Sequence, residues 1–139
     1  MLIKPKKSLG QNFLHDENII NKIINASKIS SDDQVLEVGP GTGNLTKLII
    51  SQKPKKIYVI EKDKSLAADL EKQYYNKINV INEDILKITN EFYSGKKFLI
   101  LGNLPYNIST KILSNWCLND KLNVSKMILM FQKEVADRI

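Results

Sequence analysis

The chain has 139 residues, of which 21 are Lys or Arg and 15 are Asp or Glu, and its formal net charge is +6. This length suits a single domain, and a hydrophobic fraction of 42% is enough to build a core, which argues against a disordered chain. One cysteine and one histidine exclude an internal disulfide and argue against a multi-residue metal site. No run approaches the roughly 18–20 apolar residues of a membrane span. We therefore expect a soluble, cytoplasmic protein, whose basic excess permits a polyanionic partner.

Strand-like apolar runs alternate with helix-like segments along the chain, which predicts an α/β fold with a doubly wound, mostly parallel sheet. The expected strands cover residues 34–39, 55–61, 78–81, 97–101 and 127–131. The expected helices cover residues 16–28, 44–51, 64–75 and 109–118, and another helix is expected to begin within residues 132–139. No repeat or linker divides the chain, so it is expected to form one unit.

Two of the expected helices have residues at core spacing. In the first, Ile19, Ile20, Ile23 and Ile24 are expected to form one apolar stripe, with His15 or Asp16 as the N-cap. In the fourth, Trp116 and Cys117 are expected to lie in the core.

A glycine-rich turn, VLEVGPGTGN, follows the first expected strand and precedes a helix. Gly39, Gly41 and Gly43 would let the backbone turn sharply and approach a ligand at the helix N-terminus. The dinucleotide fingerprint G-x-G-x-x-G would place a glycine at position 44, where this sequence has Asn44. The turn therefore favours a ligand without a pyrophosphate, although a plain strand-to-helix turn is the simpler alternative.

Two acidic residues are expected near the same rim of the sheet. Glu61 ends the second expected strand, where a carboxylate can accept both hydroxyls of a ribose. Asp84 follows the third strand and could accept from an adenine amine. These residues predict a nucleoside cofactor, but they barely distinguish S-adenosylmethionine from NAD.

The segment GNLPYN, residues 102–107, follows the fourth expected strand. An adenine or cytosine amine is a poor nucleophile, and acceptors aimed at its protons would favour its methylation. Asn103 and the Leu104 carbonyl could be these acceptors, while Pro105 biases Leu104 towards an extended conformation. Tyr106 offers a face on which an extruded base can stack. A strand-ending turn is the alternative interpretation, which the combination of residues disfavours.

The N-terminal segment contains a short basic arm of Lys4, Lys6 and Lys7. Such an arm is more often a solvated tail, but in a nucleic-acid enzyme it would contact phosphates.

With KSLGQNFL, EVGPGTGNLT, GNLPYNIST and FQKEVADRI in this order, residues 7–139 resemble the ribosomal RNA adenine dimethyltransferase family, most closely its bacterial small-subunit branch. The resemblance implies a Rossmann-like class I methyltransferase fold. It also implies transfer of methyl groups from S-adenosylmethionine to N6 of two adjacent adenosines near the 3′ end of 16S rRNA, in the small ribosomal subunit or its precursor.

The resemblance also implies roles for individual residues. Cofactor contacts fall on Asn12, Leu14, Gly39, Gly41, Glu61, Asp84 and Asn103. The catalytic segment and target-base pocket fall on Asn103, Leu104, Pro105 and Tyr106, with Phe13 as a further contact to the base.

Family members are longer than this chain. We therefore expect residues 1–139 to be the N-terminal methyltransferase domain, with the sheet cut after its fifth strand and the family's C-terminal helical domain absent. Three alternatives remain open: a large-subunit rRNA methyltransferase of the macrolide-resistance type, a non-catalytic RNA-binding module of ribosome assembly, and an NAD-linked dehydrogenase.

Overall fold

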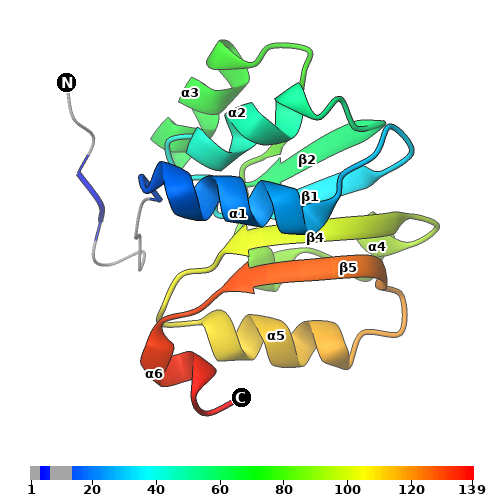
Figure 1. The fold of residues 1–139 in the computed structure, drawn as a ribbon. Helices are drawn as coiled ribbons and strands as arrows, with labels where there is room; N and C mark the ends of the chain where they lie inside the picture. Colours follow the sequence, from blue (N-terminus) through cyan, green and yellow to red (C-terminus); the bar gives the residue numbers. More distant parts are fainter. Residues whose placement is uncertain (1–3, 7–13) are drawn as a thin grey trace.

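The computed structural model describes residues 4–6 and 14–139. Its centre is a five-stranded sheet in the order β3-β2-β1-β4-β5, in which every neighbouring pair is parallel (Figure 1). The strands are β1 (Gln34–Val38), β2 (Lys56–Ile60), β3 (Asn79–Ile81), β4 (Lys97–Asn103) and β5 (Asn123–Met130). The predicted doubly wound sheet is therefore confirmed.

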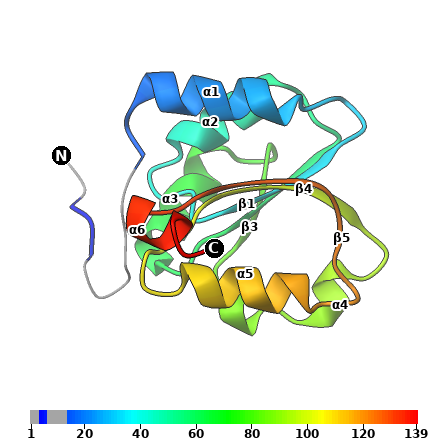
Figure 2. The same ribbon diagram turned by 60° about the horizontal axis from the view of Figure 1, so that its bottom comes forward.

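Helices cover both faces of the sheet, as crossover connections between parallel strands require. Helices α1 and α2 lie over one face, and α4 and α5 lie over the other (Figures 1 and 2). The helical elements are α1 (Glu17–Ser27), α2 (Asn44–Ser51), α3 (Lys64–Gln73), the 3₁₀ helix η2 (Ile85–Lys87), α4 (Asn90–Tyr93), α5 (Ser109–Cys117) and α6 (Lys133–Ala136).

Two apolar cores hold the layers together, one on each face of the sheet. Successive strand residues point to opposite faces, so Val35 joins one core and Leu36 the other. Both side chains are fully buried, and each such burial contributes roughly 1.5–3 kcal/mol. The strands are apolar on both faces because both faces are covered.

Helix α1 begins as predicted, with one correction to its apolar stripe. Asp16 is the N-cap: its Oδ1 accepts from the backbone N–H of Asn18 at 2.9 Å and of Ile19 at 3.2 Å. Ile20, Ile23 and Ile24 are buried, but Ile19 is 42% exposed. Consecutive helical residues are about 100° apart, so the stripe at the sheet excludes Ile19.

Helix α5 contains a second correction. Trp116 is buried, and its Nε1–H donates to the Tyr93 hydroxyl at 3.3 Å. Cys117 was predicted to be in the core but is exposed, because it lies one position beyond the inward-facing residue of this helix.

The edge strand β5 begins at Asn123, earlier than the apolar run had indicated. Its polar beginning includes Lys126, whose Nζ donates to the carbonyls of Ala26 at 3.3 Å and Ser27 at 3.1 Å. These carbonyls belong to the last turn of α1, where a cation is favourable. A lysine inside this strand therefore stabilises the neighbouring helix.

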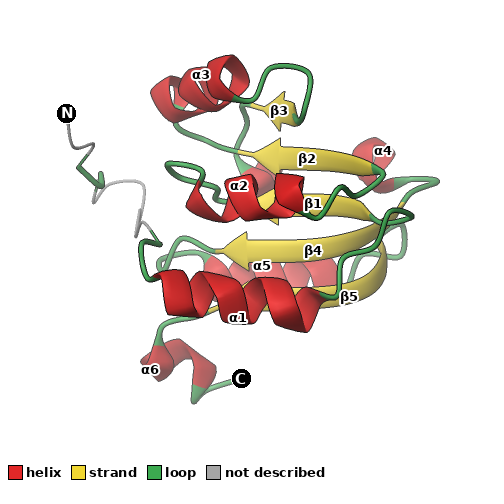
Figure 3. Cartoon of the chain, turned by 45° about the horizontal axis from the view of Figure 1, so that its top comes forward, coloured by secondary structure: helices red, strands yellow, loops and turns green. Residues whose placement is uncertain are grey.

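The carboxyl ends of the strands meet at one edge of the sheet (Figure 3). Val38 pairs in register with Ile60 and Gly102, and Asn103 pairs with Met130. The turns that follow β1, β2 and β4 are consequently neighbours, and β1 lies at the point where the strand order reverses. Ligands bind outside such a point in open α/β sheets. In the described part of the chain, no helix is long and apolar enough to cross a membrane.

Candidate functional site

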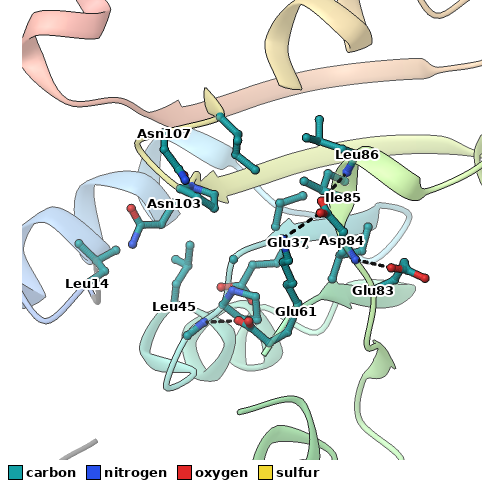
Figure 4. A pocket seen from close by; sticks show the side chains of 18 of the residues that line it. Leu14, Glu37, Leu45, Glu61, Glu83, Asp84, Ile85, Leu86, Asn103 and Asn107 are labelled. Carbon is teal, nitrogen blue, oxygen red and sulfur yellow. Dashed lines mark hydrogen bonds and ion pairs between the residues drawn. The ribbon is translucent and has the colours of Figure 1, made fainter. Parts of the chain in front are cut away.

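A cavity of about 240 Å³ lies at this carboxyl edge of the sheet (Figure 4). The predicted site residues that line it come from five separate segments of the chain, and they are Leu14, Gly39, Gly41, Glu61, Asp84, Asn103 and Pro105. The fold therefore brings together the glycine turn, both acidic residues and the segment after β4.

The glycine turn is built for close approach to β4. Gly39, Gly41 and Gly43 have φ angles of +71°, +58° and +88°, a region that residues with a Cβ rarely adopt. A Cβ on Gly39 would lie 2.6 Å from the backbone oxygen of Asn103. The Gly39 N–H donates to the Ile60 carbonyl at 3.1 Å, so this residue is hydrogen-bonded to β2 and lies close against the end of β4. A side chain at position 39 would push the two halves of the site apart.

Glu61 follows β2 and is 7% exposed. Burial raises the pKa of its carboxyl group, and hydrogen bonds from backbone N–H groups partly offset that rise. Oε1 accepts from the Asp63 N–H at 2.8 Å, and Oε2 accepts from the Gly41 N–H at 3.3 Å. Each carboxylate oxygen has two lone pairs, so both can accept one further hydrogen bond from a diol. These two acceptors fit the two hydroxyls of a ribose.

Asp84 lies after β3 as the N-cap of η2. Its Oδ1 accepts from the Leu86 N–H at 3.0 Å, and its Oδ2 pairs with Lys62 Nζ at 3.0 Å. Burial alone would raise the pKa of Asp84, but the Leu86 N–H and Lys62 outweigh it, so the pKa lies below its ordinary value. A carboxylate that stays ionised can accept from an exocyclic amine.

Glu37 lines the same cavity and was not among the predicted site residues. It lies within β1, is 1% exposed and accepts a hydrogen bond from Thr46 Oγ1 at 2.6 Å. Burial raises its pKa to about 8, the Thr46 hydroxyl lowers it, and the nearby charge of Glu61 raises it. An acidic residue within the apolar run VLEV, residues 35–38, was the signal that could have identified it.

The end of β4, which extends two residues further than predicted to Asn103, and the turn that follows it separate two cavities. A second, more open cavity of about 410 Å³ is lined by Leu104 and Tyr106, and it shares Leu14 and Asn103 with the first. Leu104 is buried, whereas Tyr106 is 45% exposed. The Ile108 N–H donates to the Pro105 carbonyl at 3.2 Å, which closes the turn after this segment. Asn103 is therefore placed between two spaces that could hold two different molecules.

The structure tests only some of the predictions for the N-terminal residues. Leu14 lines both cavities, while Asn12, Phe13 and Lys7 lie outside the described residues. Lys4 and Lys6 are exposed, and Lys6 Nζ pairs with Asp63 Oδ2 at 2.5 Å.

Sequence reasoning also missed other residues of the first cavity. Lys62, Ile85 and Leu86 lie beside Asp84, and Asn107 and Ile108 follow the turn after β4. They were missed because the chain returns to the cavity wall through turns that have no distinctive motif.

Sequence comparison connects this geometry to known proteins. The chain matches the family described as "Ribosomal RNA adenine dimethylase" over residues 3–139. It is 52% identical to ribosomal RNA small subunit methyltransferase A of Pelagibacter ubique, covering 100% of this chain and 53% of that protein. It is 46% identical to the protein of the same name from Malacoplasma penetrans, covering 96% and 48%. The chain thus spans about half the length of the curated relatives it matches.

Solved structures of two related RNA methyltransferases have a similar fold. A dimethyladenosine transferase from Plasmodium falciparum is 34% identical with a TM-score of 0.79, over 91% of this chain and 46% of that one. The 23S rRNA methyltransferase ErmE is 30% identical with a TM-score of 0.77, over 90% and 50%. The fold is that of the Rossmann-like class I S-adenosylmethionine-dependent methyltransferases. With the glycine turn, the two acids and the segment after β4 at one edge of the sheet, the chain belongs to the ribosomal RNA adenine dimethylase family.

Proposed function

We propose that this chain is the catalytic part of an rRNA adenine N6-dimethyltransferase. It would transfer methyl groups from S-adenosylmethionine to two adjacent adenosines near the 3′ end of 16S rRNA, in the small ribosomal subunit or its precursor. The observation that carries the proposal is the position of Asn103, which lines both cavities. Methyl transfer needs the donor and the acceptor amine to lie next to each other. A residue that lines both cavities could contact both molecules.

The first cavity would hold the cofactor. Glu61 would accept from the ribose hydroxyls, Asp84 from the adenine amine, and the turn at Gly39 and Gly41 would pass close to the amino-acid end. When bound, S-adenosylmethionine supplies an activated methyl group on a sulfonium. A dehydrogenase is disfavoured, because Asn44 stands where the dinucleotide fingerprint needs a glycine.

The second cavity would receive the target base. The Asn103 side-chain oxygen and the Leu104 carbonyl would accept the two amine protons, which directs the nitrogen lone pair towards the methyl donor. Tyr106, almost half exposed at this cavity, would stack on the extruded base. These groups hold and orient the amine, and the proton can leave after transfer.

The names of the related proteins indicate two different RNA substrates. The curated relatives are small-subunit methyltransferases, whereas ErmE is a 23S rRNA methyltransferase with a similar fold. The higher identities are with the small-subunit proteins, and this favours 16S rRNA. In the cell, the enzyme would act in the cytoplasm during small-subunit assembly.

The test is methyl transfer from labelled S-adenosylmethionine to undermethylated small subunits, with large-subunit rRNA assayed in parallel. Asn103→Ala should lower transfer by at least about a hundredfold, because it removes an acceptor that orients the amine. Cofactor affinity should fall by no more than about tenfold, because at most one hydrogen bond to the cofactor is lost. Asn115→Ala, on the exposed part of α5, is the matched control and should keep full transfer.

Three results would contradict the proposal. Transfer that is unaffected by Asn103→Ala would remove the catalytic role of this residue. RNA binding without any transfer by the unsubstituted chain would favour a non-catalytic assembly module. Methylation of large-subunit rRNA alone would favour the macrolide-resistance type.

A further inference from the structure

Asn44 forms a long-range contact at the edge of the first cavity. It is the first residue of α2, and its side chain reaches a segment 30 residues earlier in the chain. Its Nδ2 donates to the backbone oxygen of Leu14 at 2.7 Å and lies 3.2 Å from Nδ1 of His15. This one amide therefore joins the start of α2, directly after the glycine turn, to the segment that precedes α1.

The contact fixes a residue that matters to both cavities. Leu14 lines the cavity assigned to the cofactor and the cavity assigned to the base, and it packs against the core that contains Ile20 and Leu45. It lies before α1 and belongs to no helix or strand, so no regular backbone ladder holds it in place. The side-chain amide of Asn44, which belongs to another segment, instead supplies a hydrogen bond to the Leu14 backbone.

The chemistry of the contact requires a side-chain donor. A carbonyl oxygen accepts only, so the group facing Leu14 must carry a hydrogen. The amide nitrogen has two hydrogens, and the second can reach His15 Nδ1 when the imidazole proton is on Nε2. A carboxylate of the same shape would place an oxygen against the Leu14 oxygen and repel it.

We infer that Asn44 is a positioning residue, which holds Leu14 at the junction of the two cavities and thereby raises the affinity of the first for its nucleoside cofactor. The inference rests on the proposed function for the identity of the ligand. The hydrogen bond to Leu14 exists without any ligand, so the positioning can be measured by itself.

Replacing Asn44 by Asp separates positioning from overall stability. A negative charge in the first turn of a helix interacts favourably with the helix dipole and offsets part of the stability lost with the hydrogen bond, so Asn44→Asp should lower the melting temperature less than Asn44→Ala does. The same substitution removes both N–H donors. A purely structural role for Asn44 would weaken cofactor binding in step with the loss of melting temperature, whereas positioning weakens it to a similar extent in both variants.

The experiment compares three variants of the full chain. Asn44→Asp removes the donor and adds a charge, whereas Asn44→Ala removes the whole amide group without adding a charge. Asn18→Asp makes the same substitution in the first turn of α1, at an exposed residue that lines neither cavity, and is the matched control. Each is titrated calorimetrically with S-adenosylmethionine, and the methyl resonances of Leu14 and of the buried Ile49 are recorded by NMR without ligand.

We expect both Asn44 variants to bind the cofactor about three- to tenfold more weakly, as the loss of one hydrogen bond allows, and the control to bind normally. The Leu14 methyl resonances should shift in both Asn44 variants while those of Ile49 stay in place. Unchanged Leu14 resonances, or weakening in Asn44→Asp alone, would overturn the inference. If the unsubstituted chain binds no cofactor, the proposed function fails, and the Leu14 resonances still decide whether Asn44 positions this residue.

Discussion

Glu37 lies within the central strand β1, and its carboxyl group is almost completely shielded from solvent. It is 1% exposed, and burial raises its pKa to about 8 from an ordinary value of 4.5. The folded protein therefore holds a proton on Glu37 over a pH range in which the unfolded chain has lost it. The Thr46 hydroxyl opposes this rise, because its hydrogen bond favours the ionised form.

This environment predicts a pH dependence of stability. The folded-state pKa of Glu37 is raised, so its contribution is fully present below pH 4.5 and is lost as the pH rises to about 8. The free energy of unfolding should fall across this window by up to several kcal/mol. Glu61, whose pKa is also raised, acts in the same direction, whereas Asp63 and Asp84, whose pKa values are lowered, act only in the acid range.

Urea unfolding at pH 5 and pH 8 tests this prediction. Glu37→Gln keeps the shape and cannot ionise, so it should lose less stability between the two pH values than the unsubstituted chain does. Thr46→Val removes a donor that favours ionisation and should move the loss to higher pH. Equal losses in Glu37→Gln and the unsubstituted chain would show that Glu37 is not the group responsible.

The individual site residues were predictable to the extent that they stand in motifs. Gly39 and Glu61 directly follow β1 and β2, Asn103 is the last residue of β4, and all three line the cavity. Asn44 was noticed only because it is not a glycine, and its contact with Leu14 depends on a packing between distant segments. No local pattern encodes such a contact.

At the scale of elements, the turn after β1 and the end of β4 fit together only because Gly39 has no side chain. We predict that Gly39→Ala lowers the melting temperature and weakens cofactor binding. The positive φ angle alone costs about 1–2 kcal/mol, and a Cβ 2.6 Å from the Asn103 oxygen forces a further displacement.

A second glycine in the same backbone region provides the control. Gly95 has a φ angle of +72°, and a Cβ there would meet nothing within 4 Å. Gly95→Ala should therefore lose stability only through backbone strain, and its cofactor affinity should not change. Thermal melting and calorimetry of the two variants measure the difference, and equal losses would contradict the close packing of Gly39 against β4.

Apolar periodicity predicted the long helices and the strands, but it did not predict the shortest helices. Helix α1 was predicted to within one residue at each end, because Asp16 and the isoleucines mark it. The short elements η2 and α4 were missed, since three or four residues are too few to show a period. The polar start of β5 was missed because Lys126 interrupts the apolar pattern, and its side chain donates hydrogen bonds to the end of α1 instead of packing in the core.

At the scale of the whole molecule, the parallel topology assembles the site. The alternation of strands and helices predicted the sheet, and a parallel sheet brings every strand end to one edge. The sequence therefore predicted which segments would meet, although these segments lie far apart along the chain. The division into two cavities at Asn103 was not predictable, because it depends on the side chains that fill the rim.

The central claim is that the first cavity binds S-adenosylmethionine, and calorimetric titration of this chain tests it most directly. NAD is titrated under the same conditions, because the acids at Glu61 and Asp84 would suit either nucleoside. We predict saturable binding of S-adenosylmethionine, no heat with NAD, and loss of binding when Glu61 is replaced by Ala. Binding of NAD in its place, or binding of S-adenosylmethionine that survives Glu61→Ala unchanged, would contradict the assignment of this cavity.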